Sequence, residues 1–247
     1  MKTKIFAHRG NAILEPENTL DAFQSALDLN VEGIELDIQK TQDGKIIVTH
    51  DENLQRVTNV DLEICKASYD QIKPLNAASF MNNNRNSYVP LLTEVLDLVK
   101  EKDVYLNIEL KNAQVLYPEL EEDVLDLVRE FNLEERIIFS SFNHYSIMKF
   151  RLLGTNAELA FLYMEGLFKP WKYAKKNHIH GLHPFFPNLI IPKYVKSCHK
   201  KNIKVRPWTV DDPQQMSQII ALGVDGLITN DPKTALEIRD DINNFKN

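Results

Sequence analysis

The chain has 247 residues, of which 43% are hydrophobic and 26% are charged, the composition of an ordinary globular protein. Its formal net charge is -6, from 29 basic and 35 acidic residues, which argues against a nucleic-acid-binding protein because such proteins need clustered positive charge. The length is large for one domain, but α/β barrels often reach it as a single domain.

Neither a secretory leader nor a membrane span is expected. The first strand-like segment begins within five residues of Met1, which leaves no room for a signal peptide, and no apolar stretch is long enough to cross a bilayer. The two cysteines, Cys65 and Cys198, lack C-x-x-C spacing, so we expect free thiols in a reducing compartment. We therefore expect a cytoplasmic protein without stable membrane insertion.

Strand-like and helix-like segments alternate along the chain, beginning with a strand. Short apolar runs with the length and composition of buried strands recur at intervals. The eight predicted strands are Lys4–His8, Gly33–Gln39, Val104–Lys111, Ile137–Ser141, Glu158–Tyr163, Gly181–Phe185, Lys204–Val210 and Gly226–Thr229.

Amphipathic helical patterns lie between most of these strands. In the first of them, Leu20, Phe23 and Leu27 recur at the spacing of one helix face. Asn143 and Asp212 are residue types that cap helix N-termini, and each precedes such a pattern. The predicted helices are Thr19–Leu29, Leu91–Lys100, Glu119–Phe131, Asn143–Leu153, Pro192–Lys201, Pro213–Leu222 and Pro232–Phe245.

This alternation favours a parallel (β/α)8 TIM barrel over an open doubly wound sheet. The stretch from Asp51 to Pro90 breaks the rhythm, because it is too long for a simple loop between a strand and a helix. We interpret it as a small insertion after the second strand that covers one side of the barrel mouth. The whole chain, residues 1–247, is then predicted to be a single domain.

Acidic side chains gather on one face of two predicted strands. Side chains alternate between the faces of a strand, so "GIELDIQ" places Glu35 and Asp37 on one face and its apolar residues on the other. "VYLNIELK" places Glu109 on the corresponding face of the third strand. Three hard oxygen ligands suit one divalent metal ion, Mg²⁺ or Ca²⁺. A structural role in pairing with nearby cations is the open alternative.

Two histidines end segments beside this acidic cluster. His8 ends the first strand, and His50 ends the run "IIVTH" and is followed at once by Asp51. Imidazole titrates near neutral pH, so this pair suits general acid and base catalysis. The remaining histidines are interpreted as solvated or structural, except that His183, at the end of the sixth strand, is expected near the mouth.

Positive charge and an aromatic ring are predicted at the same end of the barrel. Arg9 and Lys111 follow His8 and Glu109 closely and suit an anionic phosphate group. The segment "VRPWTV" brings Trp208 to the seventh strand, and "ITNDP" brings Asn230 to the end of the eighth. Because active sites of barrels lie at the carboxyl ends of the strands, these side chains are expected to share one site.

The segments "AHRG", "PENTLDAF" and "GIELDIQKTQDGKIIVTHD" together resemble the glycerophosphodiester phosphodiesterase family. The later segments "PLLTEVL", "NIELK", "SSF", "VRPWTVDD" and "GVDGLITNDP" resemble it too, so the similarity spans nearly the whole chain. Each element is weak alone, but their ordered combination is specific. The lack of a leader makes the chain look like the cytoplasmic branch of the family.

The resemblance implies a TIM-barrel hydrolase that converts glycerophosphodiesters, such as glycerophosphocholine or glycerophosphoethanolamine, to sn-glycerol 3-phosphate and an alcohol. The partner is then a small-molecule substrate, and no nucleic acid is expected. The residues that match the family's motifs are Glu35, Asp37 and Glu109 as metal ligands, His8 and His50 as the acid–base pair, and Arg9, Lys111 and Trp208 as substrate- or phosphate-binding residues.

Two other functions are open at this point. The first is a lysophospholipase D acting on lysophospholipids, for which Phe142, Phe185 and Phe186 are candidate groove residues. The second is a non-catalytic barrel that binds phosphorylated ligands, which predicts the loss of at least one motif residue, and none is lost. The sequence leaves open the alcohol head group, the choice between Mg²⁺ and Ca²⁺, and the choice between a monomer and a homodimer.

Overall fold

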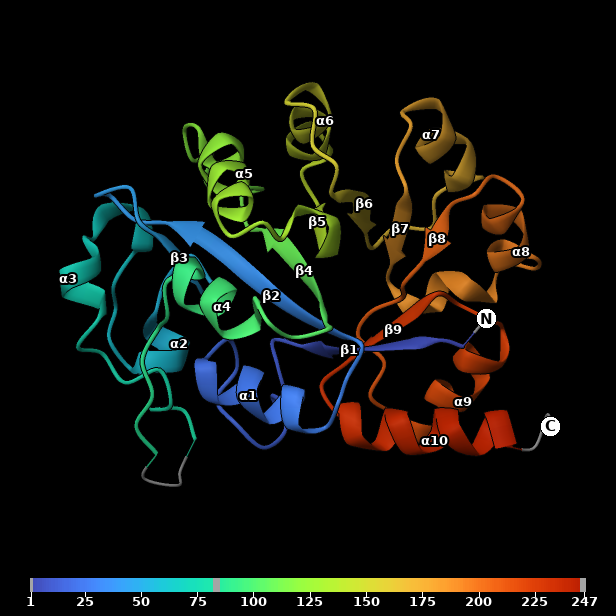
Figure 1. Cartoon of the computed structure of the whole chain (residues 1–247), viewed down its shortest axis with the longest axis horizontal. Helices are drawn as coiled ribbons and strands as arrows, with labels where there is room; N and C mark the ends of the chain where they lie inside the picture. The colour runs from blue at the N-terminus through green and yellow to red at the C-terminus, as the bar shows by residue number, and fades with distance from the viewer. Residues whose placement is uncertain (1, 82–84, 245–247) are drawn as a thin grey trace.

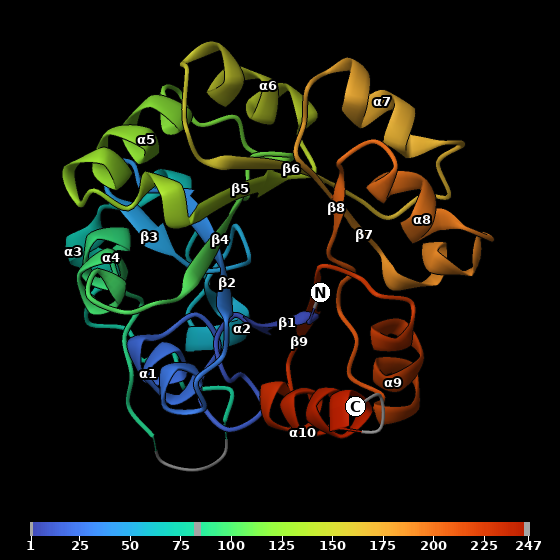
Figure 2. The same ribbon diagram turned by 45° about the vertical axis from the view of Figure 1, so that its right-hand side comes forward.

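Eight parallel strands form the wall of a barrel, which confirms the predicted fold class (Figure 1, Figure 2). This computed structural model describes residues 2–81 and 85–244. The strands, in the order in which they lie side by side, are β9 (Gly226–Thr229), β1 (Lys4–His8), β2 (Gly33–Lys40), β4 (Tyr105–Leu110), β5 (Ile137–Ser141), β6 (Glu158–Tyr163), β7 (Gly181–Pro184) and β8 (Lys204–Val205). The short strand β3 (Ile46–Val48) pairs with β2 in the antiparallel direction.

Backbone hydrogen bonds close the seam between β8 and β9. The Val210 amide donates to the Ile228 carbonyl at 3.0 Å, and the Ile228 amide donates to the Pro207 carbonyl at 3.0 Å. The predicted strand Lys204–Val210 is regular only to Val205. Pro207 has no amide hydrogen to donate, so the strand loses its regular pairing there while the chain still runs along β9.

Helices follow the strands and surround the barrel (Figure 2). They are α1 (Leu20–Asp28), α4 (Leu92–Val99), α5 (Leu120–Glu130), α6 (His144–Leu152), α7 (Pro170–Lys176), α8 (Tyr194–His199), α9 (Pro213–Ala221) and α10 (Pro232–Asn244). The predicted caps are confirmed: the Asn143 side chain accepts from the Tyr145 amide, and that of Asp212 accepts from the Gln215 amide. Among the described residues, no helix combines the length and the apolar character needed to cross a bilayer.

The sequence prediction lacked α7. Its seven residues bury only Pro170 and Ala174, so the helix shows too little apolar periodicity to be detected. The other predicted helices match the structure to within two residues at each end, except for the end of α10, where Phe245 lies outside the described residues.

The inside of the barrel is a packed core. Phe6 lies at its centre with Ile138, Ala160 and Ile228. Gly33 makes room for this ring, because a Cβ atom at that position would lie 2.2 Å from the Phe6 ring. The larger apolar layer fills the space between the strands and the helices. The space for an active site is therefore expected above this core, at the carboxyl ends of the strands.

Residues 51–90 carry two short helices and a small apolar core of their own (left side of Figure 1). The helices are α2 (Gln55–Thr58) and α3 (Tyr69–Ile72), separated by a 3-10 turn at Ile64–Lys66. Their apolar cluster includes Ile47 of β3, so β3 connects this segment to the barrel wall. The division into a single domain with an insertion stays a prediction.

Candidate active site

The three predicted carboxylates meet inside the barrel mouth. Strand alternation points Glu35 and Asp37 inward from β2, and the pairing of β2 with β4 sets Asp37 directly beside Glu109. One carboxylate oxygen from each residue lies within 4.8 Å of those of the other two. All three side chains are buried, with exposed fractions of 3%, 1% and 7%. Carboxylates at this spacing and depth repel one another unless protons or a cation intervene.

The charges in this cluster fit a divalent cation. Burial raises the pKa of Glu35, and the neighbouring Asp37 and Glu109 raise it further. Burial likewise raises the pKa of Glu109, although Lys111 opposes the shift. Asp37 behaves differently, because Arg9 and Lys111 outweigh the effect of burial and lower its pKa. Its buried Oδ1 atom has no hydrogen-bond partner among the described residues, so this oxygen is free to ligate.

His8 presents one ring nitrogen to the cluster. Its Nδ1 lies 2.7 Å from Oδ1 of Asn230, and the Asn230 amide is itself oriented by donating from Nδ2 to Asp211 at 2.7 Å. The amide oxygen can only accept, so Nδ1 donates and Nε2 is left unprotonated, 3.9 Å from Oε2 of Glu35. Burial, followed by the charge of Arg9, lowers the His8 pKa to about 4.

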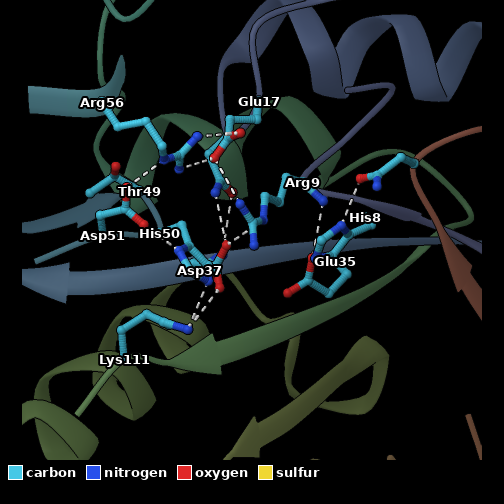
Figure 3. Close-up of polar contacts among 12 residues, drawn as sticks. His8, Arg9, Glu17, Glu35, Asp37, Thr49, His50, Asp51, Arg56 and Lys111 are labelled. Atoms are coloured by element: carbon cyan, nitrogen blue, oxygen red, sulfur yellow. Dashed lines mark hydrogen bonds and ion pairs between the residues drawn. The ribbon is translucent and has the colours of Figure 1, made fainter. Parts of the chain in front are cut away.

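His50 has the same orientation but a charged partner. Its Nδ1 lies 2.6 Å from Oδ1 of Asp51, while Nζ of Lys111 lies 3.1 Å from its Nε2 (Figure 3). The hydrogen bond with His50 holds the Asp51 pKa well below its usual range. Both imidazoles therefore fix Nδ1 on a partner behind the ring, one an amide and the other a carboxylate, and turn Nε2 toward the acidic cluster.

Arg9 and Lys111 form the basic wall of the site. Arg9 donates from Nη1 to Glu17 at 2.9 Å, and its Nε lies 3.4 Å from Asp37 (Figure 3). Lys111 donates to Glu109 at 2.9 Å. The sharp turn after Arg9 requires Gly10, whose φ is +83° and whose missing Cβ would lie 2.7 Å from Ala22 of α1. This turn also brings the Arg9 amide to within 3.0 Å of Glu35.

Sequence reasoning missed a second layer of charged residues at the rim. Arg56 of α2 donates to Asp51 from Nε at 2.5 Å and to Glu17 from both Nη atoms at 2.9 and 2.7 Å. Arg56 thus connects Asp51, the partner of His50, with Glu17, the partner of Arg9. Glu17 lies in the quoted "PENT" segment and could have been noticed, but Arg56 lies in the segment 51–90, where no sequence pattern was recognised.

These groups line a small cavity of about 80 Å³ at the carboxyl ends of the strands. Asp37 lies beneath it, while Phe142 and Trp208 close one side with their rings 5.4 Å apart. Its lining residues are His8, Arg9, Glu35, His50, Asn107, Glu109, Lys111, Phe142, Leu162, Trp208, Thr209 and Ile228.

Trp208 and His183 lie differently with respect to the cavity. The indole nitrogen of Trp208 donates to the His183 carbonyl at 2.8 Å, so Trp208 offers the cavity its ring and no hydrogen-bond donor. The expectation that His183 reaches the mouth is wrong. His183 is fully buried in the barrel interior, where Arg206 lies 3.4 Å from its Nε2, and it does not line the cavity.

Comparisons with known proteins show the family of the chain. Residues 8–234 match the family described as "Glycerophosphoryl diester phosphodiesterase family". The chain belongs to this family. A glycerophosphodiester phosphodiesterase of Caldanaerobacter subterraneus subsp. tengcongensis is 42% identical over 96% of this chain and 98% of its own length. That of Bacillus altitudinis is 40% identical over 97% of this chain and 99% of its own length.

The solved structures agree in fold. The crystal structure described as that of a "Putative glycerophosphoryl diester phosphodiesterase" from Silicibacter pomeroyi superposes with a TM-score of 0.89, covering 98% of this chain and 94% of the other at 24% identity. The resemblance stated from the sequence motifs is therefore confirmed, as is the prediction of an enzyme of the glycerophosphodiester phosphodiesterase class. The buried triad of Glu35, Asp37 and Glu109 is able to hold a metal ion in this family.

Proposed function

We propose that this protein is a metal-dependent phosphodiesterase that hydrolyses glycerophosphodiesters, such as glycerophosphocholine or glycerophosphoethanolamine, to sn-glycerol 3-phosphate and an alcohol. Full-length relatives at 42% and 40% identity that carry this name support the assignment. The observation that carries it is the convergence of three buried carboxylates and two oriented imidazoles on one cavity. A phosphodiester anion needs such a site, with positive charge on its oxygens and two groups that move protons.

Glu35, Asp37 and Glu109 would hold one divalent ion, Mg²⁺ or Ca²⁺, because all their donors are hard oxygens. When bound, such an ion neutralises phosphate oxygens and the charge gained in the transition state. Arg9 and Lys111 add two positive charges from the protein itself, and the carboxylates that they contact hold them in place. Trp208 would contact the substrate through its ring face.

The two histidines are suited to different proton transfers. Whichever oxygen attacks phosphorus, a glycerol hydroxyl or water, one proton must leave it and one must reach the departing alkoxide. His8 rests on a neutral amide and is neutral with Nε2 free, so it is suited to accept a proton. His50 rests on the carboxylate of Asp51, which orients its ring, so it is the candidate to protonate the departing alkoxide.

The test is the release of sn-glycerol 3-phosphate from glycerophosphocholine by His8→Ala and His50→Ala. Each substitution is expected to lower kcat by about 10²–10⁴-fold, the usual contribution of one proton transfer. His199→Ala is the matched control, since His199 lies outside the cavity and pairs with Asp225. Near wild-type turnover in either cavity variant would contradict the proposed pairing.

A lysophospholipase D activity is the second candidate, and one feature favours it. An open groove of about 570 Å³ adjoins the catalytic cavity and shares Phe142 and Leu162 with it. Stacked rings of His144 and Tyr173 line its wall. Comparing kcat/KM for lysophosphatidylcholine and glycerophosphocholine separates the two activities. A higher kcat/KM for lysophosphatidylcholine would favour the lysophospholipase D activity over the hydrolysis of glycerophosphodiesters.

A further inference from the structure

Positive charge is concentrated in one segment of this acidic chain. Residues 166–210 contain ten Lys and Arg residues and no Asp or Glu. The rest of the chain contains 19 basic residues against 35 acidic ones. The chain therefore contains a strongly basic segment although its formal net charge is -6. Such an uneven distribution of charge indicates an anionic partner for the basic segment.

Eight of these ten cations lie in or directly next to α7 and α8, which are neighbours in both views (Figure 1, Figure 2). Arg206 is buried, and Lys204 forms an ion pair with Glu158 at 2.6 Å. The other eight lysines are exposed, and none of them forms an ion pair within residues 2–81 and 85–244. Their charge is therefore not neutralised by a carboxylate of the described residues, although Nζ of Lys169 lies 4.6 Å from the centre of the Phe168 ring.

Exposed apolar side chains stand beside the cations at one end of these helices. Phe168 is 87% exposed and precedes Lys169, the N-cap residue of α7. Ile190 is 88% exposed and lies three residues before Lys193, the N-cap residue of α8. The two loops contact each other, since the Asn188 side chain donates to the Met164 carbonyl at 3.0 Å. Together they form one projecting surface, hereafter the α7–α8 tip.

The α7–α8 tip lies at the same end of the barrel as the catalytic cavity. Its loops follow the carboxyl ends of β6 and β7, as the catalytic loops follow β1, β2 and β4. Phe168 also borders the groove that shares Phe142 and Leu162 with the cavity. A surface that binds the tip would therefore face the rim of the active site.

We propose that the α7–α8 tip is a docking surface for an anionic phospholipid bilayer. Phe168 and Ile190 would enter the interfacial layer, and Lys169 and Lys193 would contact lipid phosphates. Bilayer interfaces bind this combination, because apolar side chains gain from leaving water while lysines are attracted to the negative surface potential. A nucleic acid would use the lysines but would leave an exposed Ile190 without a partner, so the lipid surface fits better. The nearest carboxylate before this segment in the sequence is that of Glu165.

The first test is the partition of the full chain onto phosphatidylcholine vesicles with and without about 30% phosphatidylglycerol, measured by flotation without substrate. Binding to the anionic vesicles is expected to be at least about tenfold stronger and to weaken as the salt concentration rises. The measurement needs no turnover, so its failure would leave the proposed hydrolysis untouched. Absence of partition onto anionic vesicles at low salt would overturn the docking surface.

The second test compares two charge reversals in the same segment. Lys169→Glu with Lys193→Glu changes the tip, whereas Lys200→Glu with Lys201→Glu makes the same change at the other end of α8. Glutamate can adopt the backbone conformation of the two lysines. The N-cap residue of α5 is Glu119, and its φ of 58° is close to the 53° and 64° of Lys169 and Lys193. The tip variant is expected to lose at least about tenfold in vesicle binding, since one interfacial lysine contributes roughly fivefold, and the control less than about threefold.

Both lysine variants are expected to hydrolyse soluble glycerophosphocholine at the wild-type rate. Equal losses of vesicle binding in the two variants would show diffuse attraction and overturn a specific tip. Phe168→Ser with Ile190→Ser tests the apolar part, and its control is Leu152→Ser with Leu222→Ser, two exposed residues at the carboxyl ends of α6 and α9. Binding to single-stranded oligonucleotides instead of vesicles would assign the tip to a nucleic acid.

Discussion

Both ends of the barrel hold buried or half-buried carboxylates, but the charges of these carboxylates are neutralised differently at the two ends. At the amino ends of the strands, Glu158 lies 2.5 Å from Arg206 and 2.6 Å from Lys204. Glu32 is paired there with Arg239 at 2.6 Å. At the carboxyl ends, three carboxylates within 4.8 Å of one another share only the charges of Arg9 and Lys111, besides the two imidazoles.

The pKa values of buried acids shift in opposite directions at the two ends. Burial raises the pKa of both Glu158 and Glu35. At Glu158 the adjacent Arg206 outweighs burial and brings the pKa down to about 2. At Glu35 the neighbours Asp37 and Glu109 add to it. At the amino end each of these carboxylates is paired with a cation of the protein, which serves stability. The carboxyl end has more carboxylates than cations, and a bound metal ion would neutralise this excess negative charge.

The largest effect is expected from removing one acid at the carboxyl end. Glu35→Gln should lower the release of sn-glycerol 3-phosphate from glycerophosphocholine by about 10³-fold, because the cation site loses a ligand. Its midpoint of thermal unfolding in a chelator should equal or exceed that of the wild type, since like charges are removed. Undiminished turnover, or wild-type activity that survives the chelator, would contradict the metal assignment.

The same substitution of glutamate by glutamine at the amino end is expected to lower stability and leave activity unchanged. Glu158→Gln leaves Arg206 buried without its partner and should lower the free energy of unfolding by about 3 kcal/mol. The kcat of the folded enzyme should stay at the wild-type value, because Glu158 lies below the packed core around Phe6. Denaturant unfolding and the hydrolysis assay measure the two quantities separately. Adding Arg206→Met to Glu158→Gln should restore part of the lost stability, because the unpaired buried charge is then removed.

The ion pair between Glu158 and Arg206 should also make the stability of the wild type depend on pH in acid. Because the folded-state pKa of Glu158 is depressed from 4.5 to about 2, its contribution to stability is present above pH 4.5. It is lost progressively as the pH falls from 4.5 toward 2. Between pH 7 and pH 3, the free energy of unfolding should therefore fall more steeply in the wild type than in Glu158→Gln. Parallel pH profiles would mean that Glu158 is not held ionised by Arg206.

Regular alternation made much of this molecule predictable. The period of two along β2 and β4 predicted that Glu35, Asp37 and Glu109 share the inner face, and the position of His8 at the end of β1 predicted that it lies beside them. The helices with apolar faces were equally visible. These features depend only on local sequence, which is why local sequence revealed them.

Features that depend on distant contacts were not predictable. Arg56 acts through Glu17 and Asp51, which adjoin it only after the segment 51–90 folds against the rim. His183 sits near a strand end, as His8 does, but its ring lies against Arg206 in the interior. Strand ends of one barrel reach different heights because the strands are staggered, so sequence position alone does not give depth.

The smallest effect is expected from a neutral residue at the carboxyl end. Asn230→Ala removes the acceptor that fixes the His8 ring, 2.7 Å from its Nδ1, and should lower kcat about tenfold while KM changes little. Its free energy of unfolding should change by no more than about 1 kcal/mol, in contrast to the Glu158 variant. Asn177→Ala, an amide that only contacts its own helix at the Tyr173 carbonyl, is the control. If Asn230→Ala lost stability and kept its kcat, the carboxyl end would be structural as well, and the contrast between the two ends would fail.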